Sequence, residues 1–426
     1  MFVFFKIGYF GLLSLFLFLF LTIKLVNNFN MGFQIPLLLL FLYSLQYLFV
    51  PIIVYQFPEF VVHSMEIDES KYFQIILPLF VCLSIGLFCV NTKDPLNKMR
   101  SIFDLWMTRS NTLGKASWSL LIIGAIASLF LKPTGSYLDF VFYLLKNLRF
   151  IGFFIILKND RFNKILLGFL LSYGISIYES LTNGMFHDLI IWSIFGFYVL
   201  SSTWKFSNSV AWILFLIGSV FLIGLQTIKG DYRKNLSENN DALANVQISL
   251  AESQNNGSDA IWSSLERYNQ GQIFSSVIHH LQKNNDFQKG SHMSMILRAV
   301  FFPRFLDPNK MRAGDQKIFM RYTDRVLTSN TSMAIGGFSD FFIDYGFYGA
   351  CVMSFLLGLV LSLTLKIIAL NVQFPIFYYF IPIVYLFIIR PDCELQTSLG
   401  HFFKTLVLIY FIYKLFQKEL LFKNVR

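Results

Sequence analysis

Two carboxylates four residues apart stand where they could bind a ligand or accept a proton. Asp340 and Asp344 lie in GGFSDFFIDYGFYG at 336–349, at the boundary of an apolar run. On a helix, residues at this spacing share a face. Placing a carboxylate there costs free energy unless it serves a function or has a cationic partner. Acids also stabilise the start of a helix through its dipole. Asp340 is therefore a candidate catalytic group, and Asp344 is a candidate ligand-binding group.

Three groups of basic residues adjoin apolar segments and could bind phosphate or pyrophosphate. The segments are QTIKGDYRKN at 226–235, RAVFFPRFLDPNKMR at 298–312 and IIRPDCELQTSLGHFFK at 388–404. Prolines in the second segment reduce the backbone freedom that binding would remove. Basic side chains at helix ends also extend to lipid headgroups without a ligand, so both interpretations stay open. The candidate binding residues are Lys229, Arg233, Arg298, Arg304, Lys310, Arg390 and Lys404.

A histidine near the third basic group is a second candidate for proton transfer. His401 precedes Lys404 by three residues, so the two would share a face of a helix. A lone histidine is more often structural than catalytic, but its basic neighbours raise the case for a chemical role. The remaining candidates, His279, His280 and His292, have no acid or cysteine at ligand spacing. With no CxxC pair, Walker A loop or GxGxxG motif either, we predict no metal and no cofactor.

The composition places most of this chain in lipid. Of 426 residues, 55% are hydrophobic, 18% are aromatic and only 14% are charged, whereas soluble domains carry about a quarter charged residues. The net charge of +10 could suggest nucleic acid. However, the basic residues recur in short loops between apolar runs, as the positive-inside rule expects, so nucleic acid is not predicted as a partner.

Apolar runs long enough to cross a bilayer predict an all-α polytopic membrane protein of about 11 transmembrane helices. The division expected is a bundle of about eight helices at 1–228, a long extracytoplasmic loop at 229–344, and about three helices at 345–426. Lys146 and Arg149 interrupt the fifth run and must face a water-filled cavity or a partner. The runs are 7–26, 34–55, 72–90, 116–131, 137–157, 164–180, 185–202, 209–228, 345–369, 374–389 and 400–416.

Charge in the loops predicts the orientation. The basic loops 91–115 and 158–164 and the basic tail belong in the cytoplasm, whereas the acidic loop 56–71 belongs outside. With eleven helices, the N-terminus, the long segment and the short loop 390–399 then face outward. Within the long segment, the spacing of apolar residues at 261–281 predicts an amphipathic helix on the membrane surface or over a cavity.

The order of these motifs resembles the Wzy-type polymerases that join oligosaccharide repeat units in bacterial O-antigen and capsule synthesis. The resemblance covers roughly 224–350 and rests on LQTIKGDYR, the helix ending in IHH, SMILRAVFFPRFLDPNK and GGFSDFFIDYGFYGA. The matching positions are Pro303-Arg304, Pro308-x-Lys310, and Asp340 through Asp344-Tyr345-Gly346. Phe342 replaces the usual Tyr, Asp344 replaces the usual Asn, and Asp340 stands where the family often has Glu.

The resemblance implies metal-independent glycosyl transfer at the outer face of the bacterial cytoplasmic (inner) membrane. A sugar hydroxyl of one undecaprenyl-pyrophosphate-linked oligosaccharide would attack the anomeric carbon of another, and undecaprenyl pyrophosphate would leave. Cations would stabilise the leaving group, and Asp340 or His401 would act as base or orienting acceptor. Membrane lipids surround the bundle, and a chain-length regulator and a flippase are further candidate partners.

Two other functions stay open from the sequence. An O-antigen ligase has a similar architecture and the same leaving group, but it transfers glycan to the lipid A core. A lipid-linked oligosaccharide transporter or flippase would predict matching halves, which the sequence does not show. Two weaker signals add little: acidic Glu66, Asp68 and Glu69, as possible metal ligands of a dolichol-type glycosyltransferase, and an Arg-x10-Gly spacing from Arg325 to Gly336, which chance would supply.

Overall fold

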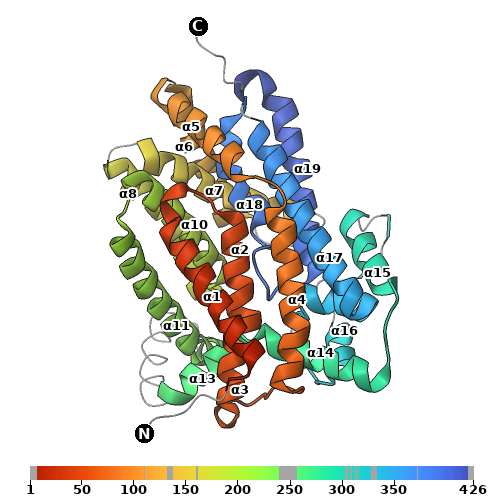
Figure 1. The fold of residues 1–426 in the computed structure, drawn as a ribbon. Coiled ribbons are helices and arrows are strands. Elements are labelled where there is room, and N and C mark those ends of the chain that lie inside the picture. The colour runs from red at the N-terminus through yellow and green to blue at the C-terminus, as the bar shows by residue number, and fades with distance from the viewer. Residues whose placement is uncertain are drawn as a thin grey trace.

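The computed structural model describes residues 7–109, 111–131, 138–159, 162–238, 257–302, 306–307, 309–311, 314, 316–327, 333–371 and 373–420. Its regular elements in these ranges are all helical (Figure 1). Those up to the long segment are α1 (Tyr9–Asn27), η1 (Phe29–Met31), α2 (Ile35–Ser44), η2 (Leu45–Phe49), α3 (Val50–Gln56), η3 (Pro58–Phe60), α4 (Glu69–Phe88), α5 (Lys93–Arg109), α6 (Asn111–Phe130), α7 (Asp139–Asn159), α8 (Phe162–Phe169), η4 (Leu170–Gly174), α9 (Ile175–Asn183), α10 (His187–Trp204) and α11 (Asn208–Glu238). The later ones are α13 (Gly257–Arg267), α14 (Gln270–Asn284), α15 (Ser291–Phe301), α16 (Gln316–Thr323), α17 (Gly337–Leu370), η5 (Pro375–Phe380), α18 (Ile381–Tyr385) and α19 (Leu395–Leu420).

The helical membrane architecture expected from the sequence is confirmed. Among the described residues, 7 helices are long and apolar enough to cross a membrane, and shorter apolar helices cover Gly114–Phe130 and Pro375–Tyr385. Every apolar run identified in the sequence overlaps one of the helices. The number of eleven spans stays a prediction.

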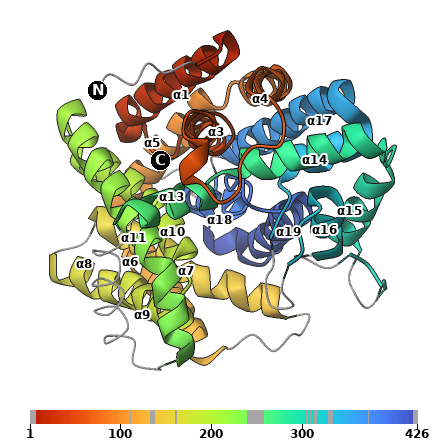
Figure 2. The same cartoon turned by 90° about the horizontal axis from the view of Figure 1, so that it is seen from below.

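The acidic loop before α4 and the basic helix α5 lie at opposite ends of the bundle, as their charges predict. Figure 1 shows α3, α13 and α14 at the end where α1 begins, and α5 at the opposite end. Figure 2 shows α13 and α14 crossing the first of these ends. The acidic loop between α3 and α4 therefore shares an end with the long segment, while the basic helix α5 lies at the other. Which end faces the cytoplasm stays a prediction.

Close backbone packing joins α4 to the part of α17 that follows its bend. A Cβ atom on Gly86 would lie 2.2 Å from the carbonyl oxygen of Phe355, and one on Gly358 would lie 2.4 Å from that of Leu83. Only glycine permits this backbone approach, which is a common basis of helix association in membranes. Near its start α17 bends at Gly346, whose φ of 59° and ψ of −161° favour glycine. The residues of α17 that precede Gly346 therefore form a separate short segment.

A proline explains the π-helical turn η2 between α2 and α3. Pro51 has no N–H, so the carbonyl oxygen four residues earlier, on Tyr47, lacks its helical donor. The hydroxyl of Tyr72 in α4 donates a hydrogen bond of 2.8 Å to this oxygen. Both tyrosines are fully buried. The freed carbonyl thus becomes a link between two membrane helices.

The long segment is packed against the bundle more deeply than expected. The sequence predicts one amphipathic helix over 261–281, but the structure contains α13 and α14, separated at Tyr268 and Asn269. Asn269 caps α14 by accepting a hydrogen bond of 3.0 Å from the backbone N–H of Gln272. Almost all of α14 is buried, so of the two predicted placements, on the membrane surface or over a cavity, the first does not hold for this part.

Of the two environments predicted for the charges of the fifth run, a water-filled cavity or a partner, Arg149 has the second. Its guanidinium lies 2.6 Å from a carboxylate oxygen of Glu179 on α9 and donates to the hydroxyl of Ser176 at 2.8 Å. It also donates to the hydroxyl of Ser128 on α6. Arg149 is buried, and these contacts replace the water that its charge has lost.

Candidate active site at the junction of α15, α17 and α19

Asp344 determines where α15 begins. Its carboxylate accepts hydrogen bonds from the backbone N–H of Gly290 at 2.9 Å, of His292 at 3.1 Å and of Met293. The first N–H groups of a helix have no partner within the helix, and a carboxylate satisfies both their hydrogen-bonding capacity and the helix dipole. Asp344 is only 2% exposed. In the structure, this candidate ligand-binding residue therefore caps the start of α15.

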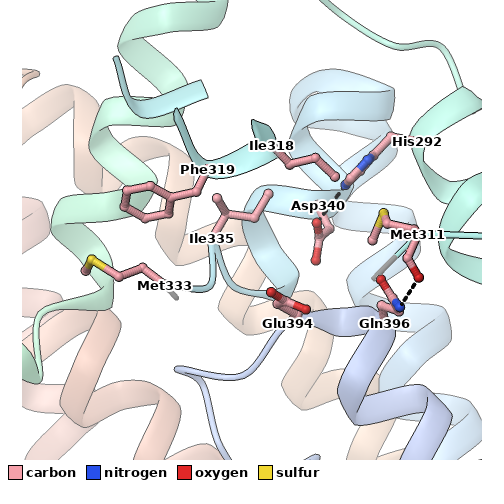
Figure 3. A pocket seen from close by; sticks show the side chains of 9 residues that line it. All are labelled: His292, Met311, Ile318, Phe319, Met333, Ile335, Asp340, Glu394 and Gln396. Atoms are coloured by element: carbon pink, nitrogen blue, oxygen red, sulfur yellow. Dashed lines mark hydrogen bonds and ion pairs between the residues drawn. The ribbon is translucent and has the colours of Figure 1, made fainter. Parts of the chain in front are cut away.

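Asp340 joins three segments that are far apart in the sequence. One carboxylate oxygen lies 2.8 Å from Nε2 of His292 on α15, and the other accepts a hydrogen bond of 3.2 Å from the backbone N–H of Leu395, the first residue of α19. Asp340 and His292 are both buried (Figure 3). Asp340 and Asp344 thus share the face of α17 that the sequence predicts, and that face contacts α15.

The electrostatics of this pair favour a charged histidine. Burial alone would lower the pKa of His292, but the hydrogen bond and negative charge of Asp340, with the charge of Asp344, raise it above its usual value. Arg321 opposes this effect more weakly. A protonated His292 donates to Asp340, which can still accept a further hydrogen bond from another group.

A cavity of about 20 Å³ lies beside the His292–Asp340 pair. Polar groups from α15, α17 and the start of α19 line one part of it, and apolar side chains line the rest. The lining residues are His292, Met311, Ile318, Phe319, Met333, Ile335, Asp340, Glu394 and Gln396 (Figure 3). The space is sufficient for about one water molecule.

A larger, open groove of about 600 Å³ lies along α15 and the bend of α17. Its lining combines apolar side chains with three polar ones, those of Ser294, Arg298 and Tyr345. Nε of Arg298 lies 2.5 Å from Oδ2 of Asp307, and the arginine side chain is 64% exposed. The lining residues are Gly290, Met293, Ser294, Leu297, Arg298, Phe301, Phe302 and Tyr345.

The third basic group comes together around aromatic rings of α7 and the loop before α19. The ring of His401 packs against Phe387 with centroids 4.6 Å apart, and its Nε2 donates to the carbonyl oxygen of Ile383 at 2.7 Å. The guanidinium of Arg390 lies 5.1 Å from the centroid of the Phe387 ring. The ammonium of Lys404 lies 5.2 Å from the centroid of an aromatic ring on α7. The predicted shared face of His401 and Lys404 is thus present. On this face, the two side chains contact aromatic rings and a backbone carbonyl oxygen.

The other candidate binding residues fall in different places. Lys310 donates to the carbonyl oxygens of Ala299 at 2.7 Å and Phe302 at 2.5 Å, so it satisfies the last turn of α15. Lys229 and Arg233 lie in α11, but their side chains are outside what the structure describes. Arg304, like both prolines of its motif, lies outside the described residues. The binding role of each of these four residues stays a prediction.

Sequence reasoning missed His292 as a functional candidate. No acid stands near His292 in the sequence, and its partner Asp340 is 48 residues away. The two weaker signals in the sequence also meet, because Arg325 lies 3.4 Å from Glu66, and Arg325 donates hydrogen bonds to two side chains of α14. The signal for His292 in the sequence is its position at the start of an apolar run that precedes the two acids in the chain.

In the part of the chain that the structure describes, no group of three or more His, Cys, Asp or Glu residues could hold a metal ion. No protein-family model, no curated protein and no solved structure matches this chain.

Proposed function

We propose that this protein is a membrane glycosyltransferase that joins oligosaccharide repeat units carried on undecaprenyl pyrophosphate, at the outer face of the bacterial cytoplasmic membrane. One observation carries the proposal. α15 presents His292 to Asp340 on its buried face and Arg298 to an apolar groove on its outer face. A proton-accepting pair and a binding surface for an anionic lipid thus lie on the same three turns of helix.

The groove fits a ligand that is apolar along its length and anionic at one end. Methionine, leucine and phenylalanine side chains offer a surface to an isoprenoid chain. Arg298 offers a planar guanidinium that binds phosphate oxygens in pairs. The Arg298 side chain is 64% exposed although its partner Asp307 is buried, so the guanidinium keeps exposed N–H groups that can bind a phosphate.

The buried pair supplies what the transfer needs at the acceptor. The acceptor hydroxyl oxygen attacks the anomeric carbon of the donor, and the bond from that carbon to the pyrophosphate oxygen breaks. The hydroxyl proton passes to the carboxylate of Asp340, which the protonated His292 holds in place, and the electron pair of the broken bond leaves with the pyrophosphate. Arg298 stabilises the charge that develops on the leaving group.

Reconstitution of the purified protein tests the proposal. Vesicles containing lipid-linked repeat units of the correct structure should yield longer chains, measured by mass spectrometry or gel mobility. We expect Arg298→Ala to reduce chain growth at unchanged protein level, and we expect the same of Arg304→Ala. Lys98→Ala, which removes an exposed positive charge at the other end of the bundle, is the matched control. Absence of elongation by the unaltered protein would refute the proposal.

A deletion strain separates polymerase from ligase. Loss of a polymerase leaves single repeat units attached to lipid A, whereas loss of a ligase leaves none attached. Full chain length with Arg298→Ala would remove this arginine from the site without affecting the broader assignment.

A further inference from the structure

The cavity beside the His292–Asp340 pair contains a buried acceptor without a donor among the described residues. Nε2 of Gln396 donates to the carbonyl oxygen of Met311 at 3.0 Å, which fixes the orientation of the amide. Its Oε1 is buried and has no hydrogen-bond partner in the part of the chain that the structure describes. Gln396 is 9% exposed and lines the cavity together with Asp340. An unsatisfied buried carbonyl oxygen is destabilising, so its presence beside a cavity points to a ligand.

The other groups around the cavity limit what that ligand can be. Glu394 is already engaged, because it accepts hydrogen bonds from the backbone N–H of Gly314 at 2.6 Å and from the hydroxyl of Thr397 at 3.3 Å. Figure 3 shows Asp340 between His292 and the side chains of Glu394 and Gln396. The remaining walls are apolar, and the volume of about 20 Å³ admits a single oxygen atom with its hydrogens.

We infer that this cavity is a subsite for one hydroxyl group of the acceptor sugar, with Gln396 as the residue that orients it. The inference rests on the proposed glycosyl transfer and adds to it a binding group outside the motifs of the sequence. Oε1 of Gln396 and the carboxylate of Asp340 are both acceptors. A water molecule can donate to both, and a sugar hydroxyl can donate to one of them. When no acceptor sugar is bound, we expect a water molecule at this position.

This arrangement predicts how the enzyme selects its acceptor. A site that hydrogen-bonds a substrate hydroxyl discriminates strongly against analogues lacking it, because its own buried groups then lose their partner. Loss of the Gln396 oxygen should therefore weaken binding of the acceptor sugar and leave binding of the donor lipid unchanged, since Gln396 does not line the donor groove.

The first experiment measures both Michaelis constants in reconstituted vesicles. We expect Gln396→Met, which keeps the volume but removes the acceptor oxygen, to raise the KM for acceptor about tenfold with the KM for donor unchanged. Gln396→Glu, which keeps an oxygen at the same place, should have a smaller effect. Met333→Leu is the control, because it alters an apolar wall of the same cavity. An unchanged acceptor KM in Gln396→Met, or an equal rise in both constants, would overturn the inference.

The second experiment does not depend on turnover. Radiolytic hydroxyl labelling should modify Phe319, which is 1% exposed and lines the cavity, only where a bound water lies beside it. Labelling should fall in Gln396→Met, while Phe274, equally buried but away from the cavity, stays unlabelled in both proteins. A Phe319 ring that is never labelled would show a dry cavity and refute the subsite alone. No transfer by the unaltered protein would refute the proposed function and the subsite together.

Discussion

The carboxylate of Asp344 accepts a hydrogen bond of 2.9 Å from the backbone N–H of Gly290, and this contact joins the start of α15 to the first turns of α17. Gly290 has a φ of 93°, which allows the chain to turn sharply into the helix. Because the same carboxylate also holds the N–H of His292, it sets the direction in which the imidazole points. A substitution at Asp344 should therefore act on His292 indirectly.

We predict that Asp344→Ala destabilises α15 by about 1–2 kcal/mol, the usual effect of losing a helix cap. Hydrogen exchange measured by mass spectrometry should show faster exchange in peptides covering 290–301. Asp344→Asn should have a smaller effect, because the amide keeps one acceptor oxygen. Ser294→Ala, at an exposed position of the same helix, is the control. Equal exchange in Asp344→Ala and the unaltered protein would contradict the assigned role.

The raised pKa of His292 predicts a dependence of stability on pH. Because the folded state binds this proton more tightly than the unfolded state, the stabilisation is fully present below the usual pKa of 6.5 and is lost as pH rises through the higher folded value. The thermal unfolding midpoint should fall over that interval. His292→Phe should remove this component of the profile, and an unchanged profile in the variant would assign the dependence to other groups.

The pair formed by Arg149 and Glu179 predicts an asymmetric double-mutant cycle. Glu179→Leu leaves a buried guanidinium without its carboxylate and should cost about 3–5 kcal/mol. The double variant Arg149→Met with Glu179→Leu should recover most of this loss, because no unpaired charge then remains in the bundle. Thermal unfolding in detergent is the measurement. A double variant that is as unstable as Glu179→Leu would show that packing, and not charge, dominates at this position.

Tyr72→Phe tests the link at the π-helical turn. The variant keeps the ring but leaves the carbonyl oxygen of Tyr47 without a donor inside the bundle, which should cost about 1–3 kcal/mol. Tyr410→Phe, on an exposed part of α19, should be close to neutral. Equal unfolding midpoints for the two variants would mean that water or another donor satisfies the carbonyl.

Local spacing was sufficient for some of this architecture. The apolar runs predict the helices, the i, i+4 spacing predicts that Asp340 and Asp344 share a face, and the cost of a charge in lipid predicts a partner for Arg149. These inferences succeed because each depends on a property of one helix or of one side chain in its solvent.

Other features depend on contacts that no local pattern encodes. His292 meets Asp340 only because α15 folds back against α17, and Arg325 meets Glu66 only because α14 packs against the bundle. The division between α13 and α14 had a readable signal, since Asn269 is a favoured cap. Their burial had none, because an amphipathic pattern does not distinguish a lipid surface from a protein one.

The hydrogen bond from the backbone of Leu395 to Asp340 has a consequence for how the protein is made. His292, Asp340 and Leu395 emerge from the ribosome in that order, and the carboxylate has both partners only after the start of α19 has been synthesised. Until then, α15 and α17 can associate, but the carboxylate oxygen of Asp340 that accepts from Leu395 does not yet have this donor. Assembly of the site is thus a late event in biogenesis, and chains truncated before residue 395 should insert most of their helices without completing it.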